Sequence, residues 1–235
     1  MNRNLMSVTT TGCAVLMAAF GAVQLSADET PRERLQAATE VLSEIMSAPD
    51  NGIPQDLLEK SHCVVIVPGL KKGAFVVGGK FGRGFLSCRA SSGRGWSAPG
   101  AVRVEGGSVG FQIGASETDV VLLVMNARGA DKLLSSQFTL GGEGELSAGP
   151  VGRSATAQTD ALMRAEILSW SRSRGVFAGI ALQGATLRQD LDANQILYGK
   201  RIENSDIVKQ GIAPPPAASK LLNVLNQYSS AELRG

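Results

Sequence analysis

The chain has 235 residues, of which 43% are hydrophobic, so it is long enough for one large domain or two small ones around a real core. Glycine is frequent, with 28 residues, and aromatic residues make up only 5%, a mixture that favours short strands and tight turns over long helices. With so few aromatic side chains available to stack on bases, we expect no nucleic-acid partner.

The first 27 residues have the pattern of a secretory signal peptide. Arg3 supplies a basic start, an uncharged apolar stretch runs from Val15 to Val23, and we predict cleavage after Ala27. The stretch is short for a transmembrane helix, with an uncleaved membrane anchor as the alternative. A cleaved signal predicts a periplasmic or secreted protein.

Two helices are predicted next. Thr30 can cap the first, Pro31 suits its first turn, and Glu33 can reach back in a capping box. Apolar residues then follow at helical spacing on one face, at Leu35, Ala38, Leu42, Ile45 and Met46. A second, short helix is predicted from Pro54 to Lys60.

The middle of the chain reads as a series of short strands. "CVVIVPG" predicts a strand that Pro68 and Gly69 stop, and "GAFVVGGKFGRGFLSCR" predicts two strands around a glycine-rich bend. "GWSAPGAVRVEGGSVGFQIG" predicts two more, broken at Gly106 and Gly107, and "TDVVLLVMN" predicts a buried strand. Strands of this kind indicate an antiparallel barrel or sandwich.

The C-terminal half mixes helices and strands. "ARGADKLLSSQ" predicts a short helix, and "AEILSWSRSRGVFAGIALQGATLRQD" predicts two strands with a turn from Ser173 to Gly175. "DLDANQILYG" and "KLLNVLNQY" predict two more helices, separated by the stiff, proline-rich "IAPPPAASK". The expected fold is therefore α+β, a barrel- or sandwich-like antiparallel core with helices at both ends. We expect the domain to span residues 28–210, followed by a linker and short helix over residues 211–235.

The glycine-rich stretch "VVGGKFGRGFL" does not match a nucleotide-binding loop. A phosphate-binding loop needs serine or threonine after its lysine, but Phe81 follows Lys80. A dinucleotide fingerprint needs a third glycine where Ser87 stands, and a helix where this sequence predicts a strand. The glycines therefore suit a bend, a bulge or close strand packing.

The sequence offers few groups for catalysis or metal binding. His62 is the only histidine of the sequence, and in a strand its neighbour Cys63 would point to the opposite face. No nucleophile elbow of the form GxSxG and no cluster of metal-ligating residues is apparent. We expect no catalytic residues, no metal and no cofactor.

Two cysteines remain after the predicted cleavage, Cys63 and Cys88. In an oxidising compartment they can form a disulfide that closes a loop of about 25 residues. Two buried free thiols are the alternative.

Charge is unevenly distributed along the chain. Residues 28–59 carry eight acidic residues and two arginines, whereas residues 60–105 carry eight basic residues and one glutamate. The asymmetry indicates either an anionic partner for the middle segment or an acidic N-terminal helix packed over it. The candidate lipid- or anion-binding residues are Lys71, Lys72, Lys80, Arg83, Arg172 and Arg174, with an ordinary solvated basic patch as the alternative.

Taken in order, six segments resemble one family. They are "VVIVPGLKKGAFVVGGKFGRGFLSCR", "GWSAPGAVRVEGGSVGFQIG", "TDVVLLVMN", "LGGEGELSAGPVG", "LSWSRSRGVFAGIALQG" and "DLDANQILYG". Together they resemble the SYLF domain, also called the Ysc84 actin-binding family, over about residues 35–202. The resemblance implies one compact α+β domain built around antiparallel strands. Eukaryotic members bind phosphoinositides, and some bind actin; a bare domain after a signal peptide is similar to secreted bacterial members.

The expected function is a non-enzymatic lipid-binding module of the cell envelope, which binds anionic phospholipid or a membrane surface. The alternative is a structural or protein-interaction module, with an envelope protein as its partner. An enzyme of unidentified type ranks third.

Overall fold

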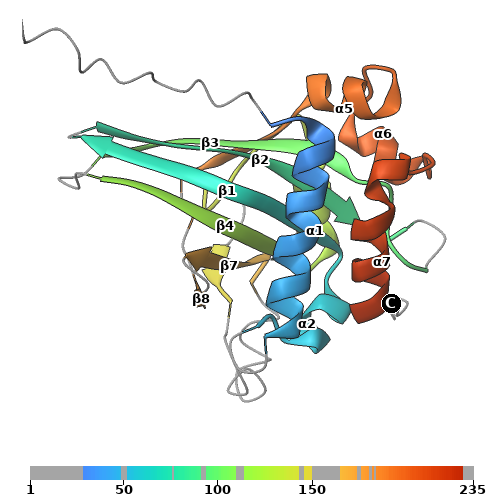
Figure 1. Cartoon of the computed structure of the whole chain (residues 1–235), viewed down its shortest axis with the longest axis horizontal. Helices are drawn as coiled ribbons and strands as arrows, with labels where there is room; N and C mark the ends of the chain where they lie inside the picture. The colour runs from blue at the N-terminus through green and yellow to red at the C-terminus, as the bar shows by residue number, and fades with distance from the viewer. Residues whose placement is uncertain are drawn as a thin grey trace, which may run out of the picture.

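The computed structural model describes residues 29–48, 52–75, 77–90, 94–109, 114–142, 146–149, 165–173, 176–179, 182 and 184–229. In these residues a mixed sheet is covered by N-terminal and C-terminal helices, which confirms the predicted α+β fold class (Figure 1). The predicted signal peptide and the candidate Arg174 lie outside the described residues.

The sheet has nine strands in the described part of the chain. Their spatial order is β5-β9-β3-β2-β1-β4-β7-β6, with β8 paired to β7. The β6–β7 pair is parallel and the other described pairs are antiparallel. The strands are β1 Cys63–Phe75, β2 Val77–Cys88, β3 Gly100–Val109, β4 Gly114–Val124, β5 Gln137–Thr139, β6 Leu146–Ala148, β7 Ile167–Ser173, β8 Val176–Gly179 and β9 Thr186–Gln189.

The helices come from both ends of the chain and from the loops. They are α1 Pro31–Ser47, α2 Gln55–Lys60, α3 Ala127–Leu133, α5 Leu191–Tyr198, α6 Asn204–Lys209, the 3₁₀ turn η2 Pro216–Ala218, and α7 Ser219–Tyr228. Figure 1 shows α1 and α7 side by side in front of the sheet, and these two helices pack directly on each other. The first and last helices of the described chain therefore belong to one layer.

Each face of the sheet is covered by an apolar cluster. Phe85 and Trp170 pack with Leu42 of α1 and Leu225 of α7 on one face. Phe138 belongs to a second cluster on the other face. Adjacent residues of β1 and β4 alternate between the two clusters, so both faces of these strands are buried. This double burial explains why "CVVIV" and "VVLLV" are continuous apolar runs.

The start of α1 follows the sequence prediction. The Thr30 side chain accepts a hydrogen bond from the Glu33 amide, and the Glu33 side chain accepts one from the Thr30 amide. This reciprocal pairing holds the pKa of Glu33 below its usual value. Leu35, Ala38 and Leu42 are fully buried, so the predicted apolar face is confirmed.

The prediction that Pro68 and Gly69 stop the first strand is wrong. β1 continues to Phe75, and its register with both neighbours shifts across this dipeptide. Gly69 has a φ of 55°, a left-handed conformation in which the strand bulges and resumes. The bulge persists because β2 and β4 pair with β1 on both sides of it.

The glycine-rich stretch lies within a strand, and its predicted bend is misplaced. Lys80 and Arg83 stand inside β2, whereas Phe75 pairs with Val77 at the end of the hairpin. A Cβ atom on Gly84 would lie 2.0 Å from the Ile66 carbonyl oxygen. Close approach to the bulged strand is therefore what requires a glycine here.

The sequence also predicts one strand boundary that is absent from the sheet, and it misses one strand. β3 runs without interruption through Gly106 and Gly107, which pair with Lys80 and Gly79 of β2. The stretch after residue 165 contains three strands, β7, β8 and β9, instead of two. A pair of glycines indicates a turn in the sequence, but here β2 pairs with β3 through both glycines and keeps the strand continuous.

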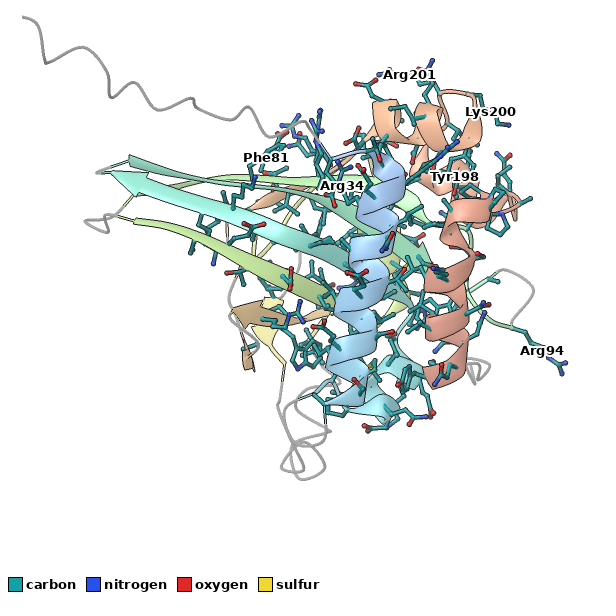
Figure 2. All side chains as sticks on the ribbon, viewed as in Figure 1. Arg34, Phe81, Arg94, Tyr198, Lys200 and Arg201 are labelled. Carbon is teal, nitrogen blue, oxygen red and sulfur yellow. A yellow bond between two sulfur atoms is a disulfide. The ribbon has the colours of Figure 1, made fainter. Side chains whose placement is uncertain are left out.

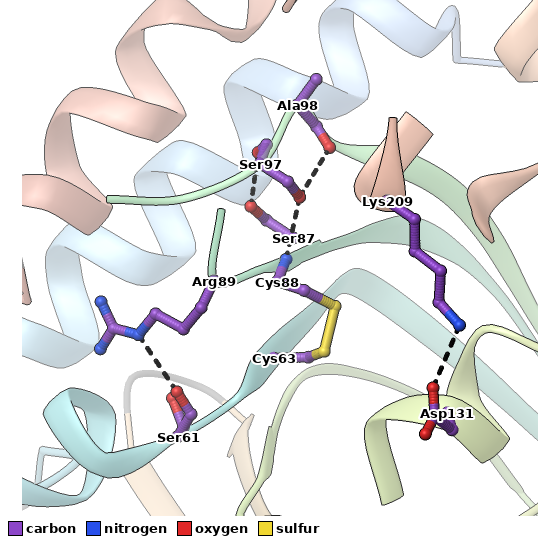
Figure 3. The surroundings of a disulfide bond; sticks show 9 residues. All are labelled: Ser61, Cys63, Ser87, Cys88, Arg89, Ser97, Ala98, Asp131 and Lys209. Carbon is purple, nitrogen blue, oxygen red and sulfur yellow. Dashed lines mark hydrogen bonds and ion pairs between the residues drawn. A yellow bond between two sulfur atoms is a disulfide. The ribbon is translucent and has the colours of Figure 1, made fainter. Parts of the chain in front are cut away.

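Cys63 and Cys88 are joined by a disulfide at the base of the β1–β2 hairpin (Figure 3). Both residues are buried, at 0% and 4% exposure. Next to the bond, Ser97 accepts a hydrogen bond from the Cys88 amide. The bond thus joins the two residues of the outermost pair of an already paired hairpin.

Reduction of this disulfide should destabilise the protein. A cross-link that closes a loop of this size contributes about 3 kcal/mol in the chain-entropy model, so the melting temperature should fall by roughly 6–12 °C in a reductant. Thermal unfolding with and without dithiothreitol measures the effect. The Cys63→Ala/Cys88→Ala variant should be insensitive to dithiothreitol; a wild-type protein that is equally insensitive would contradict the prediction.

Among the described residues, no helix combines the length and apolar character needed to cross a membrane.

Candidate functional site

A groove of about 540 Å³ lies between α1 and the sheet. Its lining combines acidic residues from α1, the residue before it and β4 with basic residues from α1 and three strands. The lining residues are Glu29, Arg34, Ala37, Glu40, Val41, Glu44, Pro68, Gly69, Lys71, Phe81, Gly82, Arg83, Glu117, Asp119 and Arg172. In Figure 2, Phe81 stands on the sheet beside α1, and Arg34 lies near the start of that helix.

An ion-pair network closes one side of the groove. Arg172 of β7 donates two hydrogen bonds to the Asp119 carboxylate of β4, at 2.8 and 2.6 Å, and also pairs with Glu44 of α1. The Arg172 side chain is only 20% exposed. The acidic first helix therefore pairs with a basic residue of β7, which lies outside the basic middle segment at residues 60–105.

Asp119 also holds the bulge of β1. Its carboxylate accepts a hydrogen bond from the Gly69 amide at 2.9 Å, which the left-handed conformation of Gly69 allows. Burial raises the pKa of Asp119; the bond from Gly69 opposes this change and the Glu117 carboxylate adds to it. Strand, bulge and helix are thus tied together at this carboxylate.

The structure separates the predicted cations between two faces of the hairpin. Lys71 and Arg83 line the groove on the α1 face, as does Arg172. Lys72 and Lys80 lie directly opposite each other on β1 and β2, and strand alternation places them on the other face. The five candidates that the structure describes therefore do not form one surface.

The lysine pair is electrostatically unfavourable. Partial burial lowers the pKa of Lys72, and the neighbouring Lys80 charge lowers it further. Within the described ranges, neither lysine forms an ion pair, and the same is true of Lys71. These three side chains are the predicted cations that remain open to an external anion.

Sequence reasoning missed several polar residues of the site. Arg34 is 4% exposed and donates to the Glu29 backbone oxygen at 2.7 Å, although arginine at that position looks like a solvent-facing residue of the helix. Asp119 was not among the predicted site residues. Its partner Arg172 lies 53 residues away in the sequence, so only the strand order reveals the pair.

His62 has a structural position at the entry to β1. Its amide donates to the Val124 carbonyl at 2.7 Å, and its carbonyl accepts from the Arg89 amide at 2.8 Å. Burial lowers the pKa of His62, and the Arg89 charge lowers it further. In the described residues there is also no group of three histidine, cysteine or carboxylate side chains able to hold a metal ion.

Comparison with known proteins gives a consistent result. Residues 105–228 match the family model Ysc84, described as "Las17-binding protein actin regulator". LAS seventeen-binding protein 3 of Saccharomyces cerevisiae is 36% identical over 75% of this chain, and an SH3 domain-containing protein of Schizosaccharomyces pombe is 38% identical over 74%. Human SH3 domain-containing YSC84-like protein 1 is 30% identical over 83%. The aligned region covers only 39%, 41% and 56% of these relatives, respectively.

These relatives contradict the predicted location. They are proteins of yeasts and mammals, several of them named for an SH3 domain, whereas the prediction required a bacterial envelope or a secreted protein. That prediction rested on the N-terminal composition alone, in residues outside the described part of the chain.

Proposed function

The chain belongs to the Ysc84 family, and on that premise we propose that it is a non-enzymatic binding module whose partner is an actin-regulating protein or actin itself. The observation that carries the proposal is the match over residues 105–228 to a family described as Las17-binding actin regulators. The groove supports a binding role, because it is a hollow of about 540 Å³ lined by both acidic and basic side chains.

Co-sedimentation tests this function directly. The full chain is mixed with purified actin filaments, and in a second arm with purified Las17 on beads. We expect it to pellet with at least one of the two at moderate salt. A chain that stays in the supernatant in both arms would overturn the proposal.

A second candidate function is binding to anionic phospholipid. The supporting observation is that Lys71, Lys72 and Lys80 form no ion pair with described residues. They lie on a hairpin that Figure 1 shows extending well past α1. Cations near an anionic bilayer contribute about 1 kcal/mol each.

Replacing these lysines should abolish such binding. The Lys71→Gln/Lys72→Gln/Lys80→Gln variant should bind phosphatidylserine vesicles on the order of a hundredfold more weakly than the wild type. Vesicle co-sedimentation at two salt concentrations measures this. The matched control removes three exposed lysines from helices and their flanks, Lys60, Lys200 and Lys220. Equal losses in both variants, or no wild-type pelleting, would contradict the lipid function.

A further inference from the structure

Three arginines stand in direct register across three neighbouring strands. Arg83 of β2 pairs with Arg103 of β3, and Arg103 pairs with Arg188 of β9. Directly paired residues share one face of a sheet, so the three side chains form a single row. We call Arg83, Arg103 and Arg188 the arginine row. It begins at Arg83 in the groove and runs away from α1 toward the edge of the sheet.

The two outer arginines of the row, Arg103 and Arg188, share one acidic partner in the described part of the chain. Glu105 is shared, at 3.3 Å from Arg103 Nε and 3.7 Å from Arg188 Nε. Asp190, 3.8 Å from Arg83 Nε, also accepts the hydrogen bond from the Ala193 amide that caps α5. Among the described residues, the single Glu105 carboxylate thus faces two guanidinium groups, those of Arg103 and Arg188. Like charges directly opposite each other destabilise a sheet, so the row has a cost in the free protein.

The donors of the row are held in place and remain reachable. The Nε atoms of Arg103 and Arg188 are buried and make no hydrogen bond with described residues. Their side chains are nevertheless 40% and 43% exposed, so solvent reaches the guanidinium ends. Guanidinium groups fixed in this way match the two oxygens of a carboxylate.

An apolar contact adjoins the row. Phe81 is 44% exposed, lies two residues before Arg83 on β2, and its ring stands 5.5 Å from the Arg83 guanidinium. Phe81 pairs with Glu105, so it sits beside the row on the same face. A ligand that contacts both the arginine row and Phe81 therefore carries acidic groups next to an apolar side chain.

We propose that the arginine row and Phe81 form a docking site for an acidic peptide segment of a partner protein. The row spans about 10 Å, because neighbouring strands lie about 4.8 Å apart. In an extended peptide, residues on the same side are about 6.5–7 Å apart. Two glutamates separated by one residue therefore both lie within the length of the row. This inference rests on the proposed protein-binding function and names the chemistry of the partner.

Fluorescence anisotropy with a short labelled peptide tests the site. The probe alternates glutamate with serine and carries one tryptophan, and its counterpart has glutamine in place of glutamate. The full chain should bind the glutamate probe at least about tenfold more tightly than the glutamine probe, and added salt should weaken binding. Equal affinity for the two probes would overturn the proposal.

Charge-removing variants separate this site from the rest of the surface. Arg103→Gln/Arg188→Gln should weaken binding of the glutamate probe by about tenfold or more, without lowering the melting temperature, because it relieves repulsion within the row. If the two arginines served only in a structural ion-pair network, this variant would have a lower melting temperature than the wild type. The control Lys60→Gln/Lys220→Gln removes two exposed cations from α2 and α7 and should bind the probe like the wild type.

Two further arms distinguish the possible failures. The row variant could lose binding to the glutamate probe and still pellet normally with actin filaments and Las17. In that case neither partner docks at the arginine row, so the docking proposal is wrong for them, whereas the proposed function stands. If the wild type ignores the probe but binds phosphatidylserine vesicles through the row, the ligand is a membrane and the peptide proposal is wrong.

Discussion

Replacing Gly84 by alanine should destabilise the protein by about 3 kcal/mol or more. The new Cβ atom would lie 2.0 Å from the Ile66 carbonyl oxygen and 2.8 Å from Val67 Cα. Both are backbone atoms of the central strand β1, which cannot move without breaking its pairing with β4. Thermal unfolding followed by circular dichroism should show a melting temperature lower by roughly 10 °C.

Gly107 is the matched control for this substitution. It also lies inside a strand of the same sheet, but a Cβ atom there meets nothing within 4 Å. Gly107→Ala should leave the melting temperature almost unchanged. Similar losses at both positions would mean that alanine is harmful in these strands for a reason other than the close approach of β1 and β2.

Replacing Arg89 by alanine should release the end of the C-terminal helix, at a cost of about 3 kcal/mol. The guanidinium donates to the carbonyl oxygens of Leu58, Glu59 and Ser61, and to that of Ser229 at 2.8 Å. It also lies 4.1 Å from the Trp96 ring. Burial lowers the pKa of Arg89 to about 10, so the group is still charged at neutral pH.

Unfolding in urea, followed by tryptophan fluorescence, measures this effect. Trp96 donates to the Ser229 carbonyl at 2.9 Å, so its emission should shift to longer wavelength when α7 loosens. Arg89→Lys should recover only part of the stability, because lysine cannot reach several carbonyl groups at once. Arg128→Ala, which removes an exposed arginine from α3, is the control. An Arg89→Ala variant as stable as this control would refute the role of Arg89 in holding the end of α7.

Local signals in the sequence were sufficient for most of the helices, although α6 was not predicted. The capping box of Thr30 and Glu33 and the spacing of the apolar residues define α1 within a few residues of chain. The strand limits were harder to predict because they depend on neighbours. Pro68 and Gly69 have the composition of a turn, yet pairing of β1 with two strands carries the sheet across them.

The sequence predicted which kinds of residue the site contains, but not how they are arranged in space. Basic residues in the middle segment indicated an anion-binding surface, but strand register decides which of them meet. Arg83, Arg103 and Arg188 come from three separate strands, and their alignment follows from the placement of β9 beside β3. Likewise, the pairing of Arg172 with Glu44 needs α1 to cross the sheet at one angle, which no local pattern encodes.

The contact between α1 and α7 has a consequence for synthesis on the ribosome. The apolar face of α1 is made early, but its partner Leu225 is translated roughly 180 residues after Leu42. At a translation rate of about 5–20 residues per second, some 10–40 seconds pass between the synthesis of Leu42 and that of Leu225. The nascent chain therefore exposes the side of α1 that faces α7 for most of its synthesis, and loss of the last helix would leave that side uncovered.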